Sequence, residues 1–168
     1  GLDLGGIAKG YIADRIAEYL RAQGVKSAII DLGGNIYALG QKPDGTDWRV
    51  GIQSPFKQRG ADIIGFVRVK NKSVVTSGVY ERYFEKDGRL YHHILDTKTG
   101  YPVDNGLLSV TILSDLSVDG DALSTSVFAL GLTKGLELVN SMDGVQAIFV
   151  ETDGTVTCSD GVTLEAAD

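Results

Sequence analysis

Three short segments of the chain hold residues whose types and spacing could support chemistry. The first, D-G-D-A-L-S-T at residues 119–125, places Asp121 and Thr125 four positions apart, so a helix would present both on one face. A carboxylate and a hydroxyl on one helical turn can bind a hard cation such as Mg²⁺, whose remaining ligands are water and substrate phosphates. The structural alternative is a helix cap by Asp119 or Asp121, with Thr125 bonded to its own helix.

The second segment, D-L-G-G-I-A-K-G at residues 3–10, has a glycine pair at the start of a predicted helix. Backbone N–H groups at a helix start lie at the positive end of the helix dipole and favour phosphate. Lys9 adds a cation to this end. The segment is neither a Walker loop nor a dinucleotide fingerprint, and a tight turn that requires glycine is the alternative. The letters D-L-G-G recur at residues 31–34, a match too short to indicate duplication.

The third segment, Y-H-H-I-L-D-T-K-T-G at residues 91–100, contains both histidines of the chain. Neighbouring side chains on a strand point to opposite faces, so His92 and His93 are not expected to bind one metal together. One of them could face a cleft as a base or hydrogen-bond donor; a surface histidine is the alternative. Ser77 lies outside any G-x-S-x-G elbow, so a serine hydrolase has no support.

The hydrophobic pattern predicts the elements that must position these segments. Ile12, Ile16 and Leu20 recur at four-residue spacing and predict a helix over residues 7–23 that ends at Gly24. The pattern further predicts a buried strand at 27–32, a hairpin of 36–40 with 48–53, strands at 63–70 and 74–76, a hairpin of 80–84 with 89–95, a loop at 96–106, a strand at 107–113, helices from 119 or 120 to 130 and from a Thr133 cap to about 142, and a final hairpin of 145–151 with 155–158. Strands in runs, rather than in strict alternation with helices, indicate an α+β fold with mainly antiparallel sheet flanked by helices.

Length and composition exclude several classes of protein. The chain has 168 residues, 43% of them hydrophobic, and 16 basic against 22 acidic residues give a net charge of −6. These values predict a single globular domain over residues 1–168 with a substantial core, and the acidic balance argues against a nucleic-acid partner. Cys158 is the single cysteine, which excludes an internal disulfide and a cysteine-based zinc site. No apolar stretch approaches the length of a membrane span.

Taken together and in this order, seven segments resemble the ApbE family of flavin transferases, formerly described as thiamine-biosynthesis lipoproteins. They are D-L-G-G-I-A-K-G-Y-I-A-D-R, I-I-D-L-G-G-N, W-R-V-G-I-Q-S-P, T-S-G-V-Y-E-R-Y-F, H-H-I-L-D-T-K-T-G-Y-P-V, L-S-V-T-I-L and D-A-L-S-T. The resemblance runs from Asp3 to nearly the C-terminus. It implies an ApbE-like, T-fold-like architecture. It also implies a FAD:protein FMN transferase, which uses Mg²⁺ to move the FMN moiety of FAD onto a Thr or Ser hydroxyl of a partner flavoprotein and releases AMP.

The resemblance implies a metal site on three residues. Asp121 and Thr125 match the metal-binding Asp and Thr of the family's D-A-L-S-T motif. Gly6 matches a position that binds the metal through its backbone carbonyl, which needs no side chain. Ser124 stands where some members have another metal-site acid.

The resemblance also implies roles in binding FAD and in catalysis. Asp3 and Lys9 match positions that contact FAD, and Leu108 approximately matches an apolar position against the flavin cofactor. His93 matches the histidine implicated near the transferred phosphate. Either His93 or Asp121 could accept the proton of the incoming hydroxyl, and the sequence leaves this choice open.

Partner, location and extent follow from the same resemblance. The expected partner is a flavin-domain protein like the subunits of sodium-pumping quinone reductases or Rnf-type complexes. The expected location is extracytosolic, on the periplasmic or cell-surface side, with a lipid anchor in the parent protein that these residues do not include. Because the chain begins with Gly1 just ahead of the D-L-G-G motif, we expect the C-terminal portion of a longer transferase, one that binds FAD poorly alone. Two alternatives stay open: a Mg²⁺-dependent FAD pyrophosphatase that yields FMN and AMP, and a non-catalytic FAD- or metal-binding module.

Overall fold

The computed structural model describes residues 1, 3–56, 62–80 and 83–167 of the chain. The elements are, in order, α1 (Gly5–Ala22), β1 (Ser27–Asp31), β2 (Asn35–Gly40), β3 (Trp48–Gln53), β4 (Ile63–Val69), β5 (Lys72–Gly78), β6 (Tyr83–Lys86), β7 (Arg89–His92), β8 (Leu107–Ser114), α2 (Ser117–Leu130), α3 (Leu132–Asn140), β9 (Gln146–Glu151), β10 (Val156–Cys158) and β11 (Glu165–Ala166).

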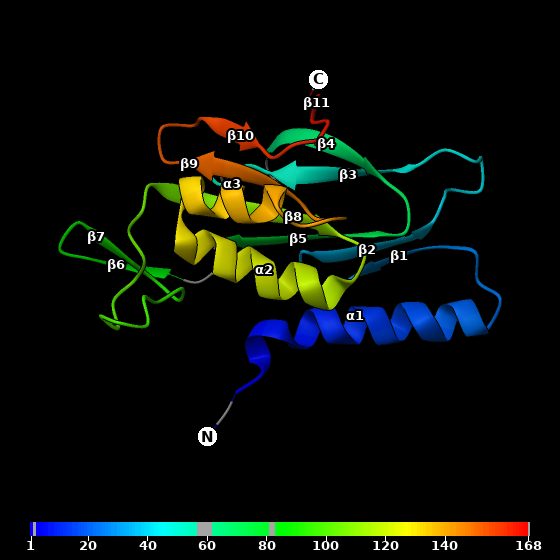
Figure 1. Ribbon diagram of the computed structural model, residues 1–168, viewed down its shortest axis with the longest axis horizontal. Coiled ribbons are helices and arrows are strands. Elements are labelled where there is room, and N and C mark those ends of the chain that lie inside the picture. The colour runs from blue at the N-terminus through cyan, green and yellow to red at the C-terminus, as the bar shows by residue number, and fades with distance from the viewer. Residues whose placement is uncertain (2, 57–61, 81–82, 168) are drawn as a thin grey trace.

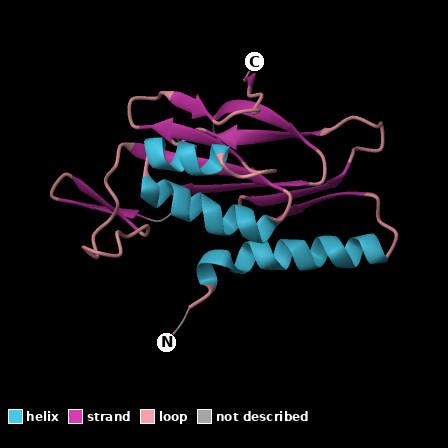
Figure 2. Ribbon diagram, viewed as in Figure 1, coloured by secondary structure: helices cyan, strands magenta, loops and turns pink. Residues whose placement is uncertain are grey.

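Three antiparallel sheets organise these strands. The central sheet has six strands in the order β1-β2-β5-β8-β9-β10, a smaller sheet has the order β11-β4-β3, and β6 pairs only with β7. The helices lie on one side of the central sheet, and the β6–β7 hairpin extends away from the body (Figures 1 and 2). The predicted α+β class with mainly antiparallel sheet is confirmed.

The central sheet is the middle of three layers because its strands bury both faces. Along β8, Val110 and Ile112 pack in the cluster under α2 and α3. Leu113, on the opposite face, packs in the cluster against the smaller sheet. β9 repeats the alternation, with Phe149 on the helix side and Ile148 on the other. Successive strand residues point to opposite faces, so one apolar run supplies both cores.

Helix α1 packs through small residues together with part of the predicted stripe, because Ile16 and Leu20 are partly buried against the same cluster. Ala13 and Ala17 are buried and meet the β1 and β2 side chains Ile30 and Tyr37, while Gly10 lies against the start of α2. Ile12 is 47% exposed, so its assignment to the buried stripe was wrong. Because Gly10, Ala13 and Ala17 are small, the axis of α1 can lie close to the sheet and to α2. This close packing determines which face of α1 is buried.

One predicted hairpin is wrong, although both of its strands form. β2 pairs with β1 and β5 in the central sheet, whereas β3 pairs with β4 in the smaller sheet. The turn near Gly45 therefore carries the chain from one layer to another. The strand at 27–32 is also not fully buried: β1 is an edge strand of the central sheet, and Ile29 is 41% exposed.

Two predicted hairpins are confirmed. Lys86 and Arg89 face each other across an Asp87-Gly88 turn in which both central residues have positive φ, the conformation that a tight two-residue hairpin turn requires. Of the predicted strand at 80–84, residues 81–82 lie outside the described residues. β9 and β10 form the final hairpin, and β11, which we did not predict, adds to β4.

The helix starts differ from the predicted ones. α2 begins at Ser117, two residues before Asp119, so neither Asp119 nor Asp121 is its N-cap. α3 begins at Leu132 after Gly131, and Thr133 is therefore not its cap. None of the helices in the described parts of the chain is both long enough and apolar enough to cross a bilayer.

Candidate functional site

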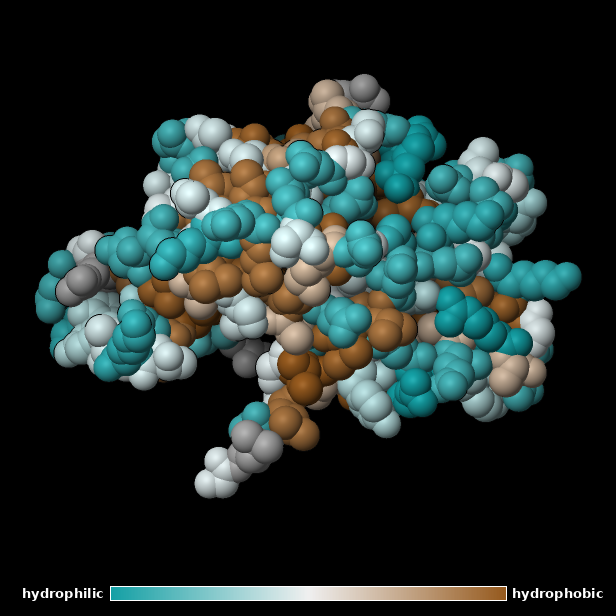
Figure 3. Space-filling view, viewed as in Figure 1, coloured by the Kyte–Doolittle hydropathy of each residue, from teal (hydrophilic) through white to brown (hydrophobic). Residues whose placement is uncertain are grey.

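The site is built where α1 crosses the first turns of α2. A Cβ placed on Gly10 would lie 2.4 Å from the Ser117 carbonyl oxygen and 2.6 Å from the Val118 Cα. Glycine is thus required at this position, because any side chain would push the helices apart. The start of α1 and the surface of α2 carry the main hydrophobic area on this face of the molecule (Figure 3). The crossing places the D-L-G-G-I-A-K-G and D-A-L-S-T segments side by side.

At this junction each helix contributes one carboxylate that accepts hydrogen bonds from backbone amides of the other helix. The Gly10 amide of α1 donates to Asp121 Oδ2 of α2 at 2.8 Å. In return, the Ser117 and Val118 amides of α2 donate to Asp14 Oδ1 and Oδ2 of α1 at 2.8 and 2.9 Å. Each helix therefore supplies amide donors to the other helix's carboxylate, and the pair is fixed in both rotation and translation.

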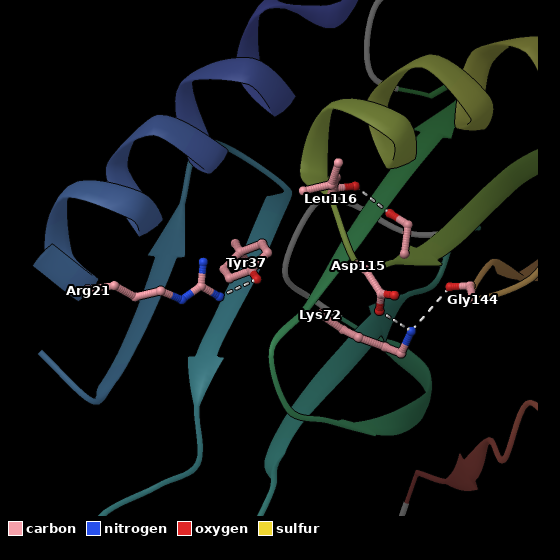
Figure 4. A network of polar contacts seen from close by, with 7 residues as sticks. Arg21, Tyr37, Lys72, Asp115, Leu116 and Gly144 are labelled. Atoms are coloured by element: carbon pink, nitrogen blue, oxygen red, sulfur yellow. Dashed lines mark hydrogen bonds and ion pairs between the residues drawn. The ribbon is translucent and has the colours of Figure 1, made fainter.

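The lead-in to α2 is fastened to the sheet as well. Lys72 Nζ bonds Asp115 Oδ1 at 2.7 Å and the Gly144 carbonyl at 3.1 Å. Ser114 Oγ donates to the Leu116 carbonyl at 2.7 Å. Figure 4 shows these contacts converging on the turn that precedes α2. The position from which α2 starts is consequently set by the ends of β5 and β8.

Asp121 is a half-buried carboxylate with little positive charge around it. Burial raises the pKa of Asp121, while the Gly10 amide and the charge of Lys9 lower it in part. Lys9 is exposed and its Nζ donates to the Gly33 carbonyl at 3.3 Å, so the lysine of the first segment contacts the D-L-G-G of residues 31–34. Burial leaves the ionised form of the Asp121 carboxylate poorly solvated and only partly neutralised by neighbouring charge. A cation bound beside this carboxylate would therefore be attracted to it strongly.

The structure joins the two helices that carry the predicted metal residues, Gly6 on α1 and Asp121 and Thr125 on α2. In an α-helix the amide of residue 10 points toward the carbonyl of residue 6, and the Gly10 amide also donates to Asp121 Oδ2, so this bond links Asp121 to the turn of α1 that contains Gly6. Thr125 is one turn further along α2. Among the described residues no three His, Cys, Asp or Glu side chains group as a metal cluster. One carboxylate with neutral oxygens fits Mg²⁺, which keeps water and substrate phosphates as its other ligands.

Hydroxyl groups from β5 and α2 line the sheet side of this turn. Ser77 Oγ lies 2.8 Å from Ser124 Oγ and 3.1 Å from Thr125 Oγ1. Ser124 is fully buried and also bonds the Asp121 carbonyl at 3.1 Å. Ser124 therefore fastens α2 to β5, and Thr125, which is exposed, is the hydroxyl that remains open to a ligand.

A separate pocket of about 250 Å³ lies at the other end of α2, and Leu108 forms part of its wall together with Val79, Tyr91, His92 and Val103. A wider hollow of about 890 Å³ shares Tyr91 and Val103 with the pocket and reaches Ser126 of α2. Ser126 directly follows Thr125. The two cavities thus extend from the predicted cofactor residue Leu108 to the C-terminal half of α2, whose preceding turn carries Asp121 and Thr125.

The two histidines have different environments. His92 is buried; its Nε2 donates to the Val103 carbonyl at 3.0 Å, and its Nδ1 accepts the Ile94 amide at 3.3 Å. Burial lowers the pKa of His92, with a smaller lowering by His93 and opposing effects of Val103 and Asp104. Both ring nitrogens are used in the neutral form, so His92 has a structural role. His93 is exposed, as alternation predicts, and it directly follows β7, an element apart from the helix crossing.

Asp3 has a local contact: its Oδ1 accepts the Gly5 amide at 2.7 Å at the start of α1. Its predicted contact with FAD stays a prediction. Sequence reasoning missed the roles of Gly10 and Gly33, which contact the predicted residues Asp121 and Lys9, and of Asp14, which bonds the first turn of α2. Asp14 lies within the same D-L-G-G-I-A-K-G-Y-I-A-D-R segment, but its partner Ser117 is 103 residues away. No short-range pattern indicates such a pairing.

Comparison with known proteins agrees with this arrangement. The model of the ApbE family matches residues 1–149. The chain belongs to the ApbE family. The chain is 49% identical over 158 residues to the FAD:protein FMN transferase of Klebsiella pneumoniae, covering 94% of this chain and 48% of that protein. It is 45% identical over 169 residues to the FAD:protein FMN transferase of Treponema pallidum, covering 96% and 46%.

Solved ApbE structures share the fold. The ApbE protein of Thermotoga maritima superposes with a TM-score of 0.85 at 38% identity, covering 95% of this chain and 51% of that one. The apo flavinyl transferase ApbE of Pseudomonas stutzeri gives a TM-score of 0.78 at 38% identity, covering 95% and 49%. The predicted ApbE-like architecture is confirmed. The chain spans about half the length of these ApbE relatives.

Proposed function

We propose that this chain supports Mg²⁺-dependent transfer of the FMN moiety of FAD to a Thr or Ser hydroxyl of a partner flavoprotein. Its relatives named FAD:protein FMN transferase support the reaction type. The structural observation that carries the proposal is the pairing of Asp121 with the Gly10 amide at 2.8 Å. This bond joins the glycine-rich helix start and the D-A-L-S-T helix into one site.

The reaction is a displacement at phosphorus. The partner's hydroxyl oxygen forms a bond to the FMN phosphorus of FAD, and the bond from that phosphorus to the bridging oxygen breaks. AMP leaves with the bridging oxygen, and the hydroxyl proton passes to a base. Because the nucleophile belongs to the partner, this chain needs no activated serine or cysteine of its own.

The chain's residues would bind and orient the pyrophosphate. The exposed ammonium of Lys9 and the amide-rich start of α1 favour the phosphate oxygens. Gly6, Asp121 and Thr125 would hold Mg²⁺, which when bound neutralises charge on the pyrophosphate and on departing AMP. The pocket beside Leu108, with Val79 and Val103 in its wall, would receive the apolar part of FAD, and the hollow that shares Val103 with it extends to Ser126 on α2.

Two residues are candidates for the base, and their environments differ. Asp121 has a raised pKa because it is buried, which makes its carboxylate a better proton acceptor than an ordinary one. His93 is exposed and directly follows His92, which lines the pocket. We assign the proton to His93, because a carboxylate that holds a cation is a poor base.

The partner and location are parts of the same proposal. A Thr or Ser hydroxyl must reach the phosphorus from outside the chain, so the acceptor is exposed on a flavin-binding domain. The partner we propose is a subunit of a sodium-pumping quinone reductase or an Rnf-type complex, and the location we propose for the encounter is the extracytosolic side of the membrane.

One assay separates the possible activities. The chain is incubated with FAD, MgCl₂ and a flavin-acceptor domain, and covalent label is read as fluorescence on a denaturing gel while AMP is quantified. We expect labelled acceptor and an equal amount of AMP. FMN and AMP without labelled acceptor would instead support a pyrophosphatase, and bound but intact FAD a binding module. An acceptor with its Thr replaced by Ala and a reaction with EDTA serve as controls.

A further inference from the structure

We propose that Asp14 is a positioning residue for Asp121: its carboxylate caps α2 from α1 and so holds Asp121 at the Gly10 amide. The inference rests on the proposed function for the use of Asp121, but the geometry it explains is independent of any ligand. Asp14 itself is one helical turn beyond Gly10 on α1 and reaches the start of α2, not the candidate metal site.

Helix α2 has no cap of its own. Its N-cap residue is Leu116, and no side chain of the N-cap bonds the first amides. The first N–H groups of a helix lack intrahelical partners, and Asp14 supplies two acceptors to Ser117 and Val118. Hydrogen bonds from amides to a carboxylate are stronger than those between neutral groups, and the negative charge also suits the helix dipole.

The contact from Asp14 is half of a two-sided attachment. On the sheet side, Ser117 Oγ lies 2.7 Å from Asn35 Oδ1 and 2.9 Å from Ser73 Oγ. All three of these side chains are buried. Asp14 provides the opposing contact from α1, so the first turn of α2 is held between the central sheet and α1.

The consequence for Asp121 follows from helix geometry. Asp121 lies four residues after Ser117, about one turn along α2. A rotation of α2 about its axis would therefore move the Asp121 carboxylate away from the Gly10 amide. Because Gly10 is in contact with the Ser117 carbonyl, the helices cannot compensate by approaching further. The hydrogen bonds of Asp14 and of Asp121 both join α1 to α2. Loss of one would let the helices move relative to each other and would therefore weaken the other.

The test measures the position of Asp121 through the Gly10 amide. ¹H–¹⁵N NMR spectra and amide hydrogen exchange are recorded for the chain and for its Asp14→Ala and Asp14→Asn variants without ligand. In Asp14→Ala we expect exchange at the Ser117 and Val118 amides to be about tenfold faster, together with a changed shift and faster exchange at Gly10. Asp14→Asn, which keeps one acceptor oxygen, restores part of both and serves if the alanine variant folds poorly.

The matched control is Asp119→Ala, which removes a carboxylate from the same first turn of α2. Asp119 is exposed and has no part in the junction, so the Gly10 signal should match the unmodified chain. An Asp14→Ala spectrum in which Ser117 and Val118 exchange faster while Gly10 is unchanged would overturn the proposal, because Asp14 would then be a stabilising cap only.

A titration with MgCl₂ alone separates this inference from the proposed function. We expect the Gly10 resonance of the unmodified chain to shift on Mg²⁺ binding, and the midpoint to rise about tenfold in Asp14→Ala, the low end for a supporting residue. If Gly10 responds to Asp14→Ala but not to Mg²⁺, the proposed metal site fails and the positioning role stands. If Mg²⁺ shifts Gly10 with equal midpoints in both proteins, the positioning role fails and the metal site stands.

Discussion

The helix crossing, formed by Gly10, Asp14, Ser117 and Asp121, and the histidine pocket, formed around His92 and Leu108, are held in opposite ways. The bonds of the crossing join residues 103 to 111 positions apart. The bonds of the His92 ring are short in sequence, to Val103 eleven residues on and to Ile94 two residues on, although Val79 and Leu108 on the opposite wall pair across the central sheet. The crossing is therefore fixed by contacts between distant segments, whereas the histidine of the pocket is fixed within its own loop.

The two regions also treat charge differently. The crossing keeps a desolvated carboxylate, Asp121, beside the cation Lys9. The pocket keeps His92 neutral through burial and two hydrogen bonds. Rigid placement suits the end of a ligand that bears charge, because electrostatic stabilisation depends on preorganised groups. A pocket whose histidine is held neutral suits an apolar ring, for which contact area matters more than exact placement.

Replacing Asp121 gives the largest expected effect. Asp121→Asn keeps an oxygen for the Gly10 amide but removes the charge, so folding should be retained while flavin transfer falls by about 10³-fold or more. The measurement is the initial rate of acceptor labelling at saturating FAD, with Asp119→Ala as the control on the same helix. A normal transfer rate in Asp121→Asn would show that Asp121 is not part of the site.

Replacing His93 tests the other end of α2. His93→Gln removes a proton acceptor but leaves the crossing intact, so we expect a loss of about 10²-fold, smaller than that of Asp121→Asn. The labelling rate should fall without a change in the MgCl₂ concentration needed for half-maximal rate. A loss as large as that of Asp121→Asn, or a shifted Mg²⁺ requirement, would contradict the division of roles between the two regions.

Two glycines of α1 test how tightly the crossing is packed. Gly10→Ala would place a Cβ against the Ser117 carbonyl and the Val118 Cα, and we expect it to lower the free energy of unfolding by about 1–3 kcal/mol. Gly6→Ala meets nothing within 4 Å, so it should leave stability equal or raise it by about 0.5–1 kcal/mol through helix propensity. Urea denaturation measures both, and equal stability of the two variants would show that the crossing tolerates separation.

The comparison also explains which features could be predicted from the sequence. The Asp87-Gly88 hairpin and the presence of a first helix follow from neighbouring residues, and both predictions are confirmed, although α1 spans Gly5–Ala22 rather than residues 7–23. The pairing of β2 with β5 rather than with β3 is a choice between two layers. Because alternating apolar residues satisfy either layer equally, local patterning could not decide between them.

The residues of the candidate site also fall into two groups, those that the sequence could predict and those that only the fold revealed. Spacing placed Asp121 and Thr125 on one helix face, and the resemblance to the ApbE family supplied Gly6, Lys9 and His93. The partners of these residues came only from the fold. A carboxylate such as Asp14 has the same letter whether it faces water or caps a helix 103 residues away, so its role depends on tertiary geometry that no short segment records.

The smallest expected effect concerns the pH dependence of the histidine pocket. Because the pKa of His92 is lowered from its ordinary value of 6.5, the unfolded chain binds a proton here more readily than the folded chain. The stability contributed by neutral His92 is then fully present above about pH 6.5 and is lost as the pH falls through the folded pKa.

Urea denaturation between pH 7.5 and 5 should therefore show a decline in the free energy of unfolding that is absent in His92→Gln and retained in His93→Gln. The carboxylates with lowered pKa, Asp44, Asp153 and Glu165, titrate below this window. A decline that persists in His92→Gln would place the titrating group elsewhere. Such a result would contradict the neutral state of His92, on which the contrast in charge between the pocket and the helix crossing depends.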